Sequence, residues 1–197
     1  MTWEDIPGWF DWPQLYDHVV SRYDGGILVE VGNYLGRSLC YLGDQVKRSG
    51  KPFYVVGVDW GVGSGVEDDG NDHHQAAVSE GGGTMAGQLH RNVLACGLKD
   101  VITLITGDSV RAASLFPNFG LTMVFIDANH SYESVSADIR TWLPKVRVGG
   151  VLAGDDIGLP DEPPEAKVWP GVVRAVTSYS RGGTTSRTTP GCTRRGE

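Results

Sequence analysis

Residues 27–38, which read ILVEVGNYLGRS, constrain the fold of this chain more than any other segment. Residues 27–31 are mostly apolar and β-branched, as is typical of a strand buried on both faces, and a turn from Gly32 to Gly36 ends the run. Apolar residues then recur at helical spacing over residues 39–46. A strand, a glycine turn and a helix in this order form the first half of a βαβ unit, which predicts an α/β fold with a parallel sheet.

The acidic residue inside this strand narrows the choice of ligand. A turn of this kind directs backbone N–H groups and the positive end of a helix towards whatever lies at the strand tip. A pyrophosphate cofactor would favour the Gly-x-Gly-x-x-Gly pattern, but here Glu30 stands two residues before Gly32. Its negative charge would repel phosphate and attract a cation. An ordinary turn, with Glu30 paired to a lysine, remains the alternative.

The composition restricts the partners. The chain has 24 acidic and 17 basic residues in 197, a net charge of −7, which disfavours nucleic acid and anionic membranes and favours a small neutral or cationic partner. No apolar run approaches the roughly twenty residues of a membrane span, and the N-terminus lacks the features of a signal peptide, so we expect a cytoplasmic protein. The three cysteines are far apart and indicate neither a disulfide framework nor a zinc site.

Further elements follow at regular intervals, and we expect one domain over residues 1–180. Residues 1–23 form an aromatic-rich, partly helical segment that we expect to pack on the sheet edge, with a role as a substrate lid as the alternative. Residues 60–83 are rich in glycine and predict a mobile flap over the cofactor site instead of a rigid element. The remaining strands are expected at 53–58, 101–105, 121–126 and 151–153, and helices at 84–96, 109–116, 133–143 and 172–179.

Acidic residues follow three of these strands. Asp59 ends the second, where doubly wound folds hold a ribose hydroxyl, although a helix cap or loop aspartate is the alternative. Asp127 and the pair Asp155 and Asp156 follow the fourth and fifth strands, about one βαβ repeat apart, so they should converge at one sheet edge. Clustered carboxylates repel one another unless a hard divalent cation, typically Mg²⁺, lies between them.

Several motifs together resemble a known family. Glu30-x-Gly32-x-x-x-Gly36 resembles motif I of class I S-adenosylmethionine (SAM) methyltransferases, and Gly-Asp108-Ser109 resembles their adenine-contacting motif, although Asp108 could equally cap the next helix. Phe-Ile-Asp-x-x-His-Ser-Tyr-Glu, then Gly-Gly-Val-Leu and Gly-Asp-Asp, resemble the small-molecule O-methyltransferase group. This group includes the macrolide-sugar and catechol enzymes and the cephalosporin-hydroxylase-like family.

The resemblance implies SAM and Mg²⁺ as cofactors and a small hydroxylated acceptor such as a sugar or a polyphenol. It implies Mg²⁺ ligation by Asp127, Asp155 and Asp156, and catalysis by Asp127 and His130, with His130 as base or substrate contact. A loop imidazole that bonds only to backbone is the alternative for His130. The implied cofactor contacts are Glu30, Gly32, Asn33, Tyr34, Gly36, Ser38, Asp59, Asp108, Ser109 and Asp127.

Two other functions remain open from the sequence. One is a truncated or degenerate SAM-binding protein without turnover, and the other is an NAD-dependent oxidoreductase, which the absent Gly-x-Gly-x-x-Gly disfavours.

The C-terminal residues depart from the family pattern. Residues 181–197 contain almost no large apolar side chain and are abruptly basic, so we expect a disordered tail. A methyltransferase domain normally ends in an antiparallel hairpin, which we therefore expect to be missing or disordered. The expected fold is a Rossmann-like doubly wound sheet of order 3-2-1-4-5 whose exposed fifth strand would permit a homodimer.

Overall fold

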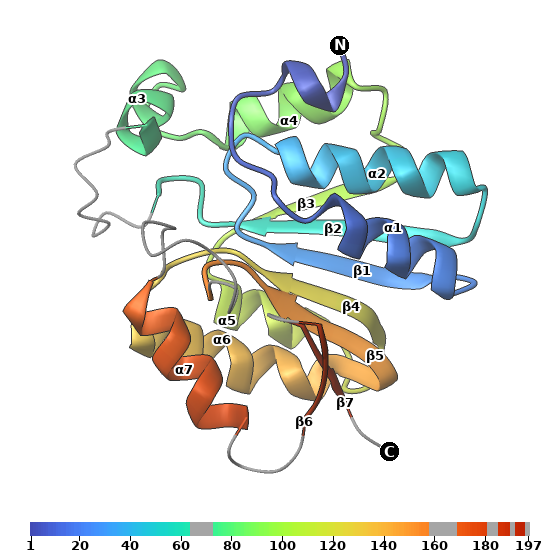
Figure 1. Ribbon diagram of the computed structural model, residues 1–197. Helices are drawn as coiled ribbons and strands as arrows, with labels where there is room; N and C mark the ends of the chain where they lie inside the picture. Colours follow the sequence, from blue (N-terminus) through green and yellow to red (C-terminus); the bar gives the residue numbers. More distant parts are fainter. Residues whose placement is uncertain (64–72, 158–168, 181–184, 190–191, 196–197) are drawn as a thin grey trace.

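The computed structural model describes residues 1–63, 73–157, 169–180, 185–189 and 192–195 (Figure 1). Its strands form one sheet in the order β3-β2-β1-β4-β5-β7-β6, and β1 to β5 are parallel. The predicted order 3-2-1-4-5 is therefore confirmed. The strands are β1 Gly26–Val31, β2 Phe53–Asp59, β3 Ile102–Thr106, β4 Leu121–Ile126, β5 Val146–Gly154, β6 Thr185–Thr189 and β7 Cys192–Arg195.

Helices cover both faces of the sheet. Helices α1, α2 and α4 lie on one face, and α5, α6 and α7 lie on the other (Figure 1). No helix in the described part of the chain has the length and hydropathy of a membrane span. The helices are α1 Pro13–Arg22, α2 Arg37–Ser49, α3 His73–Glu80, α4 Ala86–Ala95, α5 Ser109–Ala112, α6 Tyr132–Trp142 and α7 Pro170–Ser180, with short 3₁₀ turns at Trp3–Asp5, Ala113–Leu115 and Leu143–Lys145.

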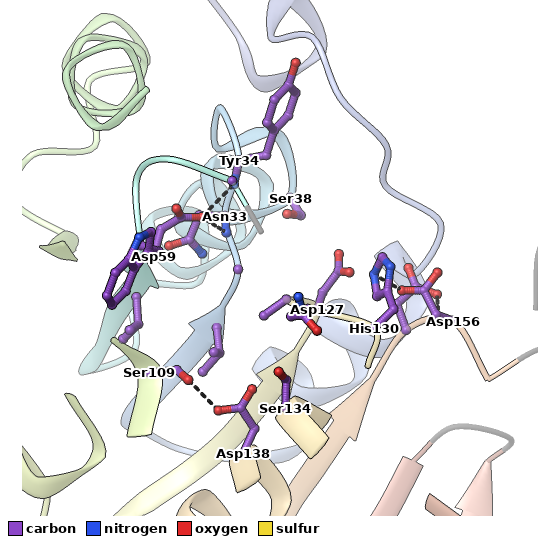
Figure 2. A pocket seen from close by; sticks show the side chains of 18 of the residues that line it. Asn33, Tyr34, Ser38, Asp59, Ser109, Asp127, His130, Ser134, Asp138 and Asp156 are labelled. Carbon is purple, nitrogen blue, oxygen red and sulfur yellow. Dashed lines mark hydrogen bonds and ion pairs between the residues drawn. The ribbon is translucent and has the colours of Figure 1, made fainter. Parts of the chain in front are cut away.

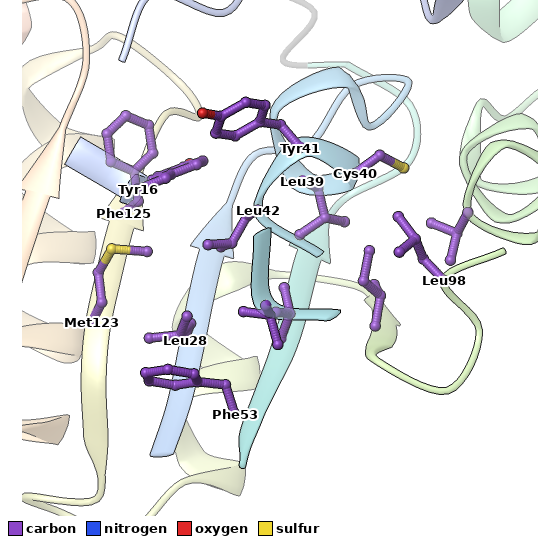
Figure 3. Packing of buried hydrophobic residues seen from close by; sticks show 14 of the residues in the cluster. Tyr16, Leu28, Leu39, Cys40, Tyr41, Leu42, Phe53, Leu98, Met123 and Phe125 are labelled. Atoms are coloured by element: carbon purple, nitrogen blue, oxygen red, sulfur yellow. The ribbon is translucent and has the colours of Figure 1, made fainter. Parts of the chain in front are cut away.

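Strand β1 supplies side chains to two separate cores, which explains its apolar sequence. Leu28 belongs to the core beneath α1 and α2, where Figure 3 shows it with Leu42 and Phe53. Val29, the next residue, belongs to the opposite core with Trp142 of α6. Because successive side chains of a strand point to opposite faces, a central strand is mostly apolar along its whole length, and Glu30 is the exception in β1.

The C-terminal hairpin corrects one prediction. Strand β7 pairs antiparallel with residues 151–153 of β5, and β6 pairs with β7, so the hairpin expected to be missing or disordered is present in the described residues. Ladder pairing uses backbone N–H and C=O groups and does not require apolar side chains, and β6 is rich in β-branched threonine. Since β7 covers this edge of β5, an exposed fifth strand no longer argues for a homodimer.

The glycine-rich segment also differs from its prediction. Within the expected flap, residues 73–80 form helix α3, so this part is a regular element, contrary to the prediction. The glycines at 81–83 follow the helix, while the helix itself contains residues compatible with helical structure. The ring of His74 lies 4.9 Å from that of Tyr34, and the ring of His73 lies 5.6 Å from that of Trp9. Residues 64–72 of the expected flap lie outside the described part.

Candidate cofactor and metal site

A cavity of about 880 Å³ opens where the parallel strands β1 to β5 end (Figure 2). Open α/β sheets bind ligands at this carboxyl edge. Glu30 and Gly36 do not line the cavity, in contrast to the rest of the predicted set. The predicted residues that line it are Gly32, Asn33, Tyr34, Ser38, Asp59, Asp108, Ser109, Asp127, His130, Asp155 and Asp156.

The glycines of the turn are required by the closeness of neighbouring groups. Gly32 has φ +86°, its N–H donates to the carbonyl of Val58, and a Cβ added to it would lie 1.7 Å from the carbonyl oxygen of Asp127. Gly36, which precedes α2, requires glycine mainly because its φ is +91°, since the nearest atom to an added Cβ, Leu89 Cδ1 at 2.5 Å, is the movable end of a side chain. Gly32 therefore allows the turn to pass directly against the end of β4.

Asp59 shapes the same turn. Its Oδ2 accepts hydrogen bonds from the backbone N–H of Asn33 at 2.6 Å and of Tyr34 at 3.0 Å (Figure 2). Its Oδ1 accepts from the N–H of Gly61 at 2.6 Å. The carboxylate thus fixes the backbone that borders the cavity, while a ribose contact by Asp59 stays a prediction.

Glu30 lies behind the turn instead of at its surface. The side chain is 1% exposed and accepts hydrogen bonds from Tyr16 Oη at 2.6 Å, Asn33 Nδ2 at 3.0 Å and Ser38 Oγ at 2.9 Å. In place of the predicted direct contact with a cationic cofactor, Glu30 joins α1, the turn and α2. Burial raises the pKa of its carboxyl to about 7, although the three hydrogen bonds oppose the rise. The motif identifies an acidic residue at position 30, but it does not predict the direction of the Glu30 side chain.

This buried carboxyl makes the stability of the protein depend on pH. Its folded-state pKa lies near 7, above its ordinary value of 4.5, so its contribution to stability is fully present below about pH 4.5 and is lost as the pH rises to 7. The loss is of order 3 kcal/mol by the usual 1.4 kcal/mol per pKa unit. We expect the free energy of unfolding in urea to change less between pH 5 and pH 8 for Glu30→Gln than for wild type. An unchanged difference would contradict the burial argument, and Glu4→Gln at an exposed position is the control.

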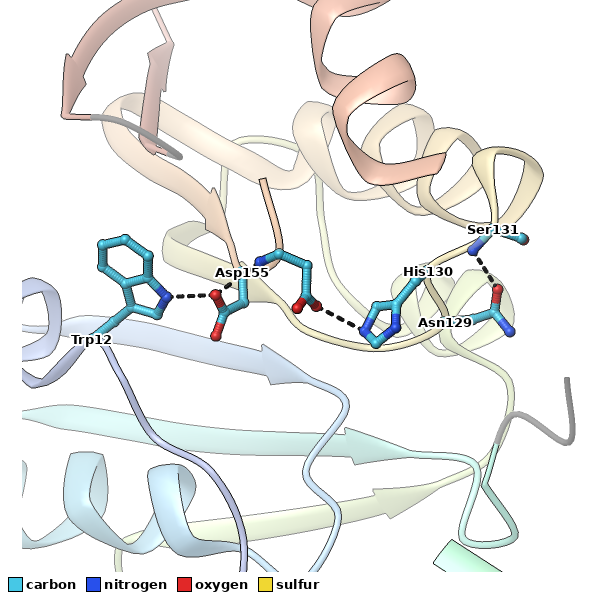
Figure 4. Close-up of polar contacts among 6 residues, drawn as sticks. Trp12, Asn129, His130, Ser131 and Asp155 are labelled. Atoms are coloured by element: carbon cyan, nitrogen blue, oxygen red, sulfur yellow. Dashed lines mark hydrogen bonds and ion pairs between the residues drawn. The ribbon is translucent and has the colours of Figure 1, made fainter. Parts of the chain in front are cut away.

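Asp127, His130 and Asp156 form the candidate metal centre. One ligand atom from each lies within 4.8 Å of the others, and His130 Nε2 is 2.7 Å from Asp156 Oδ2 (Figures 2 and 4). Asp156 has φ +66°, a left-handed conformation that is uncommon for a residue other than glycine and often marks functional sites. The structure therefore brings together two of the three predicted ligands, and it adds His130 to them.

Asp155, the third predicted ligand, is engaged differently. Its Oδ1 accepts hydrogen bonds from Trp12 Nε1 at 2.7 Å and from the backbone N–H of Asp156 at 2.8 Å (Figure 4). Burial raises the pKa of its carboxyl, and the bond from Trp12 lowers it. Asp155 Oδ2 accepts no hydrogen bond within the described residues. Asp155 lines the cavity, but it lies outside the group formed by Asp127, His130 and Asp156.

The N-terminal segment contributes to the cavity as well as to packing. Trp3, Phe10 and Trp12 pack against the core, as predicted, while Trp9 and Trp12 line the cavity. On the other side of the metal centre, the ring of Trp169 lies 4.5 Å from that of His130. Because aromatic clusters are mostly core, the sequence alone did not indicate which of these aromatic residues would also line the cavity.

Two aspartates occupy the part of the cavity formed by α5 and α6. Asp108 caps α5 by accepting the N–H of Arg111 at 2.8 Å, the alternative considered for it. Asp138, which sequence reasoning missed, lines the cavity from α6 and accepts a hydrogen bond from Ser109 Oγ (Figure 2). It stands beside Val135, Ile139 and Trp142, the buried face of its helix. A charged residue on that apolar face was the available signal.

Comparisons with known proteins agree with this arrangement. Residues 29–157 match a family model described as "Methyltransferase domain". Solved structures with the same fold include the O-methyltransferase NovP, with a TM-score of 0.64, 20% identity, and 94% of this chain and 78% of NovP covered. The O-methyltransferase TomG from Streptomyces achromogenes, solved with SAM, has a TM-score of 0.64 and 14% identity over 98% of this chain and 83% of TomG.

A third structure, of a putative caffeoyl-CoA O-methyltransferase from Staphylococcus aureus, has a TM-score of 0.63 and 12% identity over 98% of this chain and 87% of the other. At these identities the structural likeness establishes the fold, and the family model establishes the relationship. The predicted resemblance is confirmed, and the chain belongs to the methyltransferase domain family whose model it matches.

Proposed function

We propose that this protein transfers the methyl group of SAM to a hydroxyl oxygen of a small molecule, assisted by Mg²⁺. The observation that carries the proposal is that one cavity holds both the glycine turn of motif I and the cluster Asp127, His130 and Asp156. A methyl donor and a metal-held acceptor must meet in one such space, because transfer requires the oxygen to be in line with the methyl group. The likeness to O-methyltransferases makes oxygen the favoured acceptor atom.

The turn offers suitable groups for SAM. Gly32, Asn33 and Tyr34 border the cavity with backbone that Asp59 holds in place. SAM supplies an already activated methyl group, so the protein needs mainly to orient it and to exclude water. The negative charge of the cavity, with Asp59 and Asp127 among its lining residues, suits a sulfonium and an ammonium group.

The donor atoms also fit a divalent cation. The carboxylates of Asp127 and Asp156 supply hard oxygen ligands of the kind that Mg²⁺ prefers. We assign Asp155, which lines the same cavity outside that group, as a further oxygen ligand through Oδ2. When bound, such a cation lowers the pKa of a coordinated hydroxyl and fixes its direction. We assign the imidazole of His130 as the proton acceptor: the acceptor oxygen loses its proton to this ring and forms the bond to carbon as the sulfur–carbon bond breaks. A site that combines metal ligands with a proton acceptor favours methyl transfer as the function over binding of SAM without turnover.

The walls beside the metal centre favour a ring-shaped acceptor. Trp12 and Trp169 line the cavity next to Asp155 and His130, and aromatic faces pack well on flat or C–H-rich rings. The acidic residues disfavour an anionic acceptor. A neutral sugar or polyphenol with adjacent hydroxyl groups combines a ring for these walls with two oxygens for a metal.

The proposal is tested by binding followed by turnover. Calorimetry with SAM, with and without MgCl₂, measures cofactor binding, and mass spectrometry then detects methylated product from a panel of catechols, flavonoids and sugars. We expect SAM binding, metal-dependent product and loss of product with EDTA. SAM binding with no product and no S-adenosylhomocysteine would instead support a binding protein without turnover.

Trp12 tests the role assigned to Asp155. The substitution Trp12→Phe keeps an aromatic ring but removes the N–H that donates to Asp155 Oδ1. A hydrogen bond to a charged group contributes about 1.5–3 kcal/mol, so we expect methyl transfer at limiting Mg²⁺ to fall by about tenfold or more. The measurement is the Mg²⁺ dependence of initial rate, and Trp3→Phe, outside the cavity, is the control. Equal Mg²⁺ dependence in wild type and Trp12→Phe would exclude this role.

A further inference from the structure

Helix α7 begins beside the metal centre, although it lies outside residues 29–157, the range that matches the family model. Trp169, which directly precedes α7, lines the cavity, and its ring lies 4.5 Å from that of His130 at an interplanar angle of 32°. At this distance and angle the indole face lies against the imidazole. The backbone N–H of Trp169 also donates to the backbone carbonyl of Asp156 at 3.3 Å. Residue 169 therefore contacts both members of the pair His130 and Asp156.

The first turn of α7 approaches the backbone after β4 more closely than a side chain would allow. A Cβ added to Gly171 would lie 2.3 Å from the carbonyl oxygen of His130 and 2.7 Å from the backbone nitrogen of Tyr132. Gly171 lies within the helix and has no positive φ, so space and not backbone conformation requires glycine there. Further along α7, the guanidinium of Arg174 lies 3.9 Å from the centre of the Tyr132 ring. These contacts hold α7 against residues 130–132.

We infer that Trp169 and Gly171 are positioning residues, which hold His130 beside Asp156 and so keep the metal centre assembled before a metal binds. This inference rests on the proposed function, in which Asp156 ligates Mg²⁺ and His130 accepts a proton. Asp156 Oδ2 lies 2.7 Å from Nε2 of the imidazole, and the indole lies against its ring, so His130 has little freedom to turn (Figure 2). A centre whose groups already converge loses less binding free energy in ordering them.

A role of Trp169 as a cavity wall alone does not account for these contacts. A wall residue needs only its ring at the cavity, whereas Trp169 also donates a backbone hydrogen bond to Asp156. Gly171 does not line the cavity at all, yet it has the closest approach to the backbone of His130. The two roles are separable, because a wall acts on the acceptor and a positioning residue acts on the metal centre without it.

The substitutions remove one contact at a time. Trp169→Ala removes the indole, whereas Trp169→Phe keeps an aromatic face against His130. Gly171→Ala would press a methyl group against the His130 carbonyl, although alanine is otherwise the better helix former. Gly87→Ala in α4 is the matched control, since a Cβ there would meet only Arg91 Nη1, at 3.6 Å.

The experiment measures Mn²⁺ affinity by electron paramagnetic resonance with neither SAM nor acceptor present, because Mn²⁺ takes the same oxygen ligands as Mg²⁺. Removing groups that orient metal ligands weakens metal binding about 10–100-fold, which we expect for Trp169→Ala and Gly171→Ala. Trp169→Phe, which keeps an aromatic pair, should stay within about threefold of wild type. Gly87→Ala should bind as wild type does.

Proton NMR of the metal-free protein tests the ring contact itself. The indole should shift the His130 ring resonances upfield of those of the other histidines, and their absence from the spectrum of His130→Gln assigns them. The upfield shift should disappear in Trp169→Ala. Ordinary His130 shifts in wild type would contradict the ring contact, and this measurement needs no folded variant of Trp169 or Gly171.

The possible results separate this inference from the proposed function. If wild type binds no Mn²⁺, the proposed role of a metal fails, and the inference fails with it. If Trp169→Ala and Gly171→Ala bind Mn²⁺ as wild type does, or if Trp169→Phe loses as much affinity as Trp169→Ala, the positioning role is wrong and the proposed function stands. Melting curves followed by circular dichroism identify any variant that is unfolded, and the remaining variant then decides.

Discussion

Methyl transfer by Asp127→Asn should be at least about a thousandfold slower than by wild type, because the substitution removes the central carboxylate of the proposed metal centre. Asparagine keeps the size of the side chain and the backbone bond from the N–H of residue 127 to the carbonyl of Val31, so the end of β4 should keep its conformation. Metal ions contribute several kcal/mol of charge stabilisation, which corresponds to this factor in rate. The measurement is product formation at saturating SAM over a range of MgCl₂ concentrations.

Two further measurements make this result specific to the metal centre. Asp17→Asn, the same chemical change outside the cavity, should keep wild-type turnover. The melting temperature of Asp127→Asn should stay near that of wild type, which excludes unfolding as the reason for the loss. Turnover of Asp127→Asn within tenfold of wild type would show that this carboxylate does not ligate a metal needed for the reaction.

Gly32→Ala should destabilise the fold by more than about 3 kcal/mol. The new Cβ would lie 1.7 Å from the carbonyl oxygen of Asp127 and 2.5 Å from its carbonyl carbon, and these backbone atoms cannot turn away as a side chain could. Alanine at φ +86° adds strain of about 1–3 kcal/mol to this clash. Strands β1 and β4, which pair at the centre of the sheet, would have to separate. Urea unfolding monitored by circular dichroism measures the loss.

Gly50→Ala distinguishes the clash from the backbone strain. Gly50 follows α2 with φ +63°, also in the left-handed region, but a Cβ there would meet no atom within 4 Å. This variant should lose only about 1 kcal/mol, the usual cost of a non-glycine residue at such a position. Equal destabilisation of the two variants would mean that contact with the end of β4 is not what requires glycine at position 32.

Most of the fold was predictable because its central strands must be apolar on both faces. Residues 27–31 and 121–126 carry that pattern, and the helices between strands follow from apolar spacing. The pairing of β6 and β7 was missed because the attachment of β7 to β5 depends on backbone groups at a free edge, which composition does not reveal. Helix α3 was missed because glycines on either side of it dominate the composition of the segment.

The candidate site was predictable where a residue follows directly from a strand end. Asp59, Asp127 and Asp155 all border the cavity for this reason. Residues that reach the cavity from other elements were not predictable, because tertiary packing decides their orientation. Trp12 comes from the N-terminal segment and Asp138 from the buried face of α6, and neither stands in a motif. Glu30 is the opposite case, because it stands in a recognised motif but its side chain points away from the cavity.

The hydrogen bond between Tyr16 and Glu30 constrains how sequences of this kind can diverge. Phenylalanine at position 16 would leave the enclosed carboxylate with one donor fewer, and an aliphatic residue at position 30 would leave the enclosed phenol without an acceptor. Either replacement alone is costly, whereas the double replacement removes both polar groups together. Positions 16 and 30 should therefore covary among homologues, although one lies in a helix outside the matched domain and the other lies within the motif.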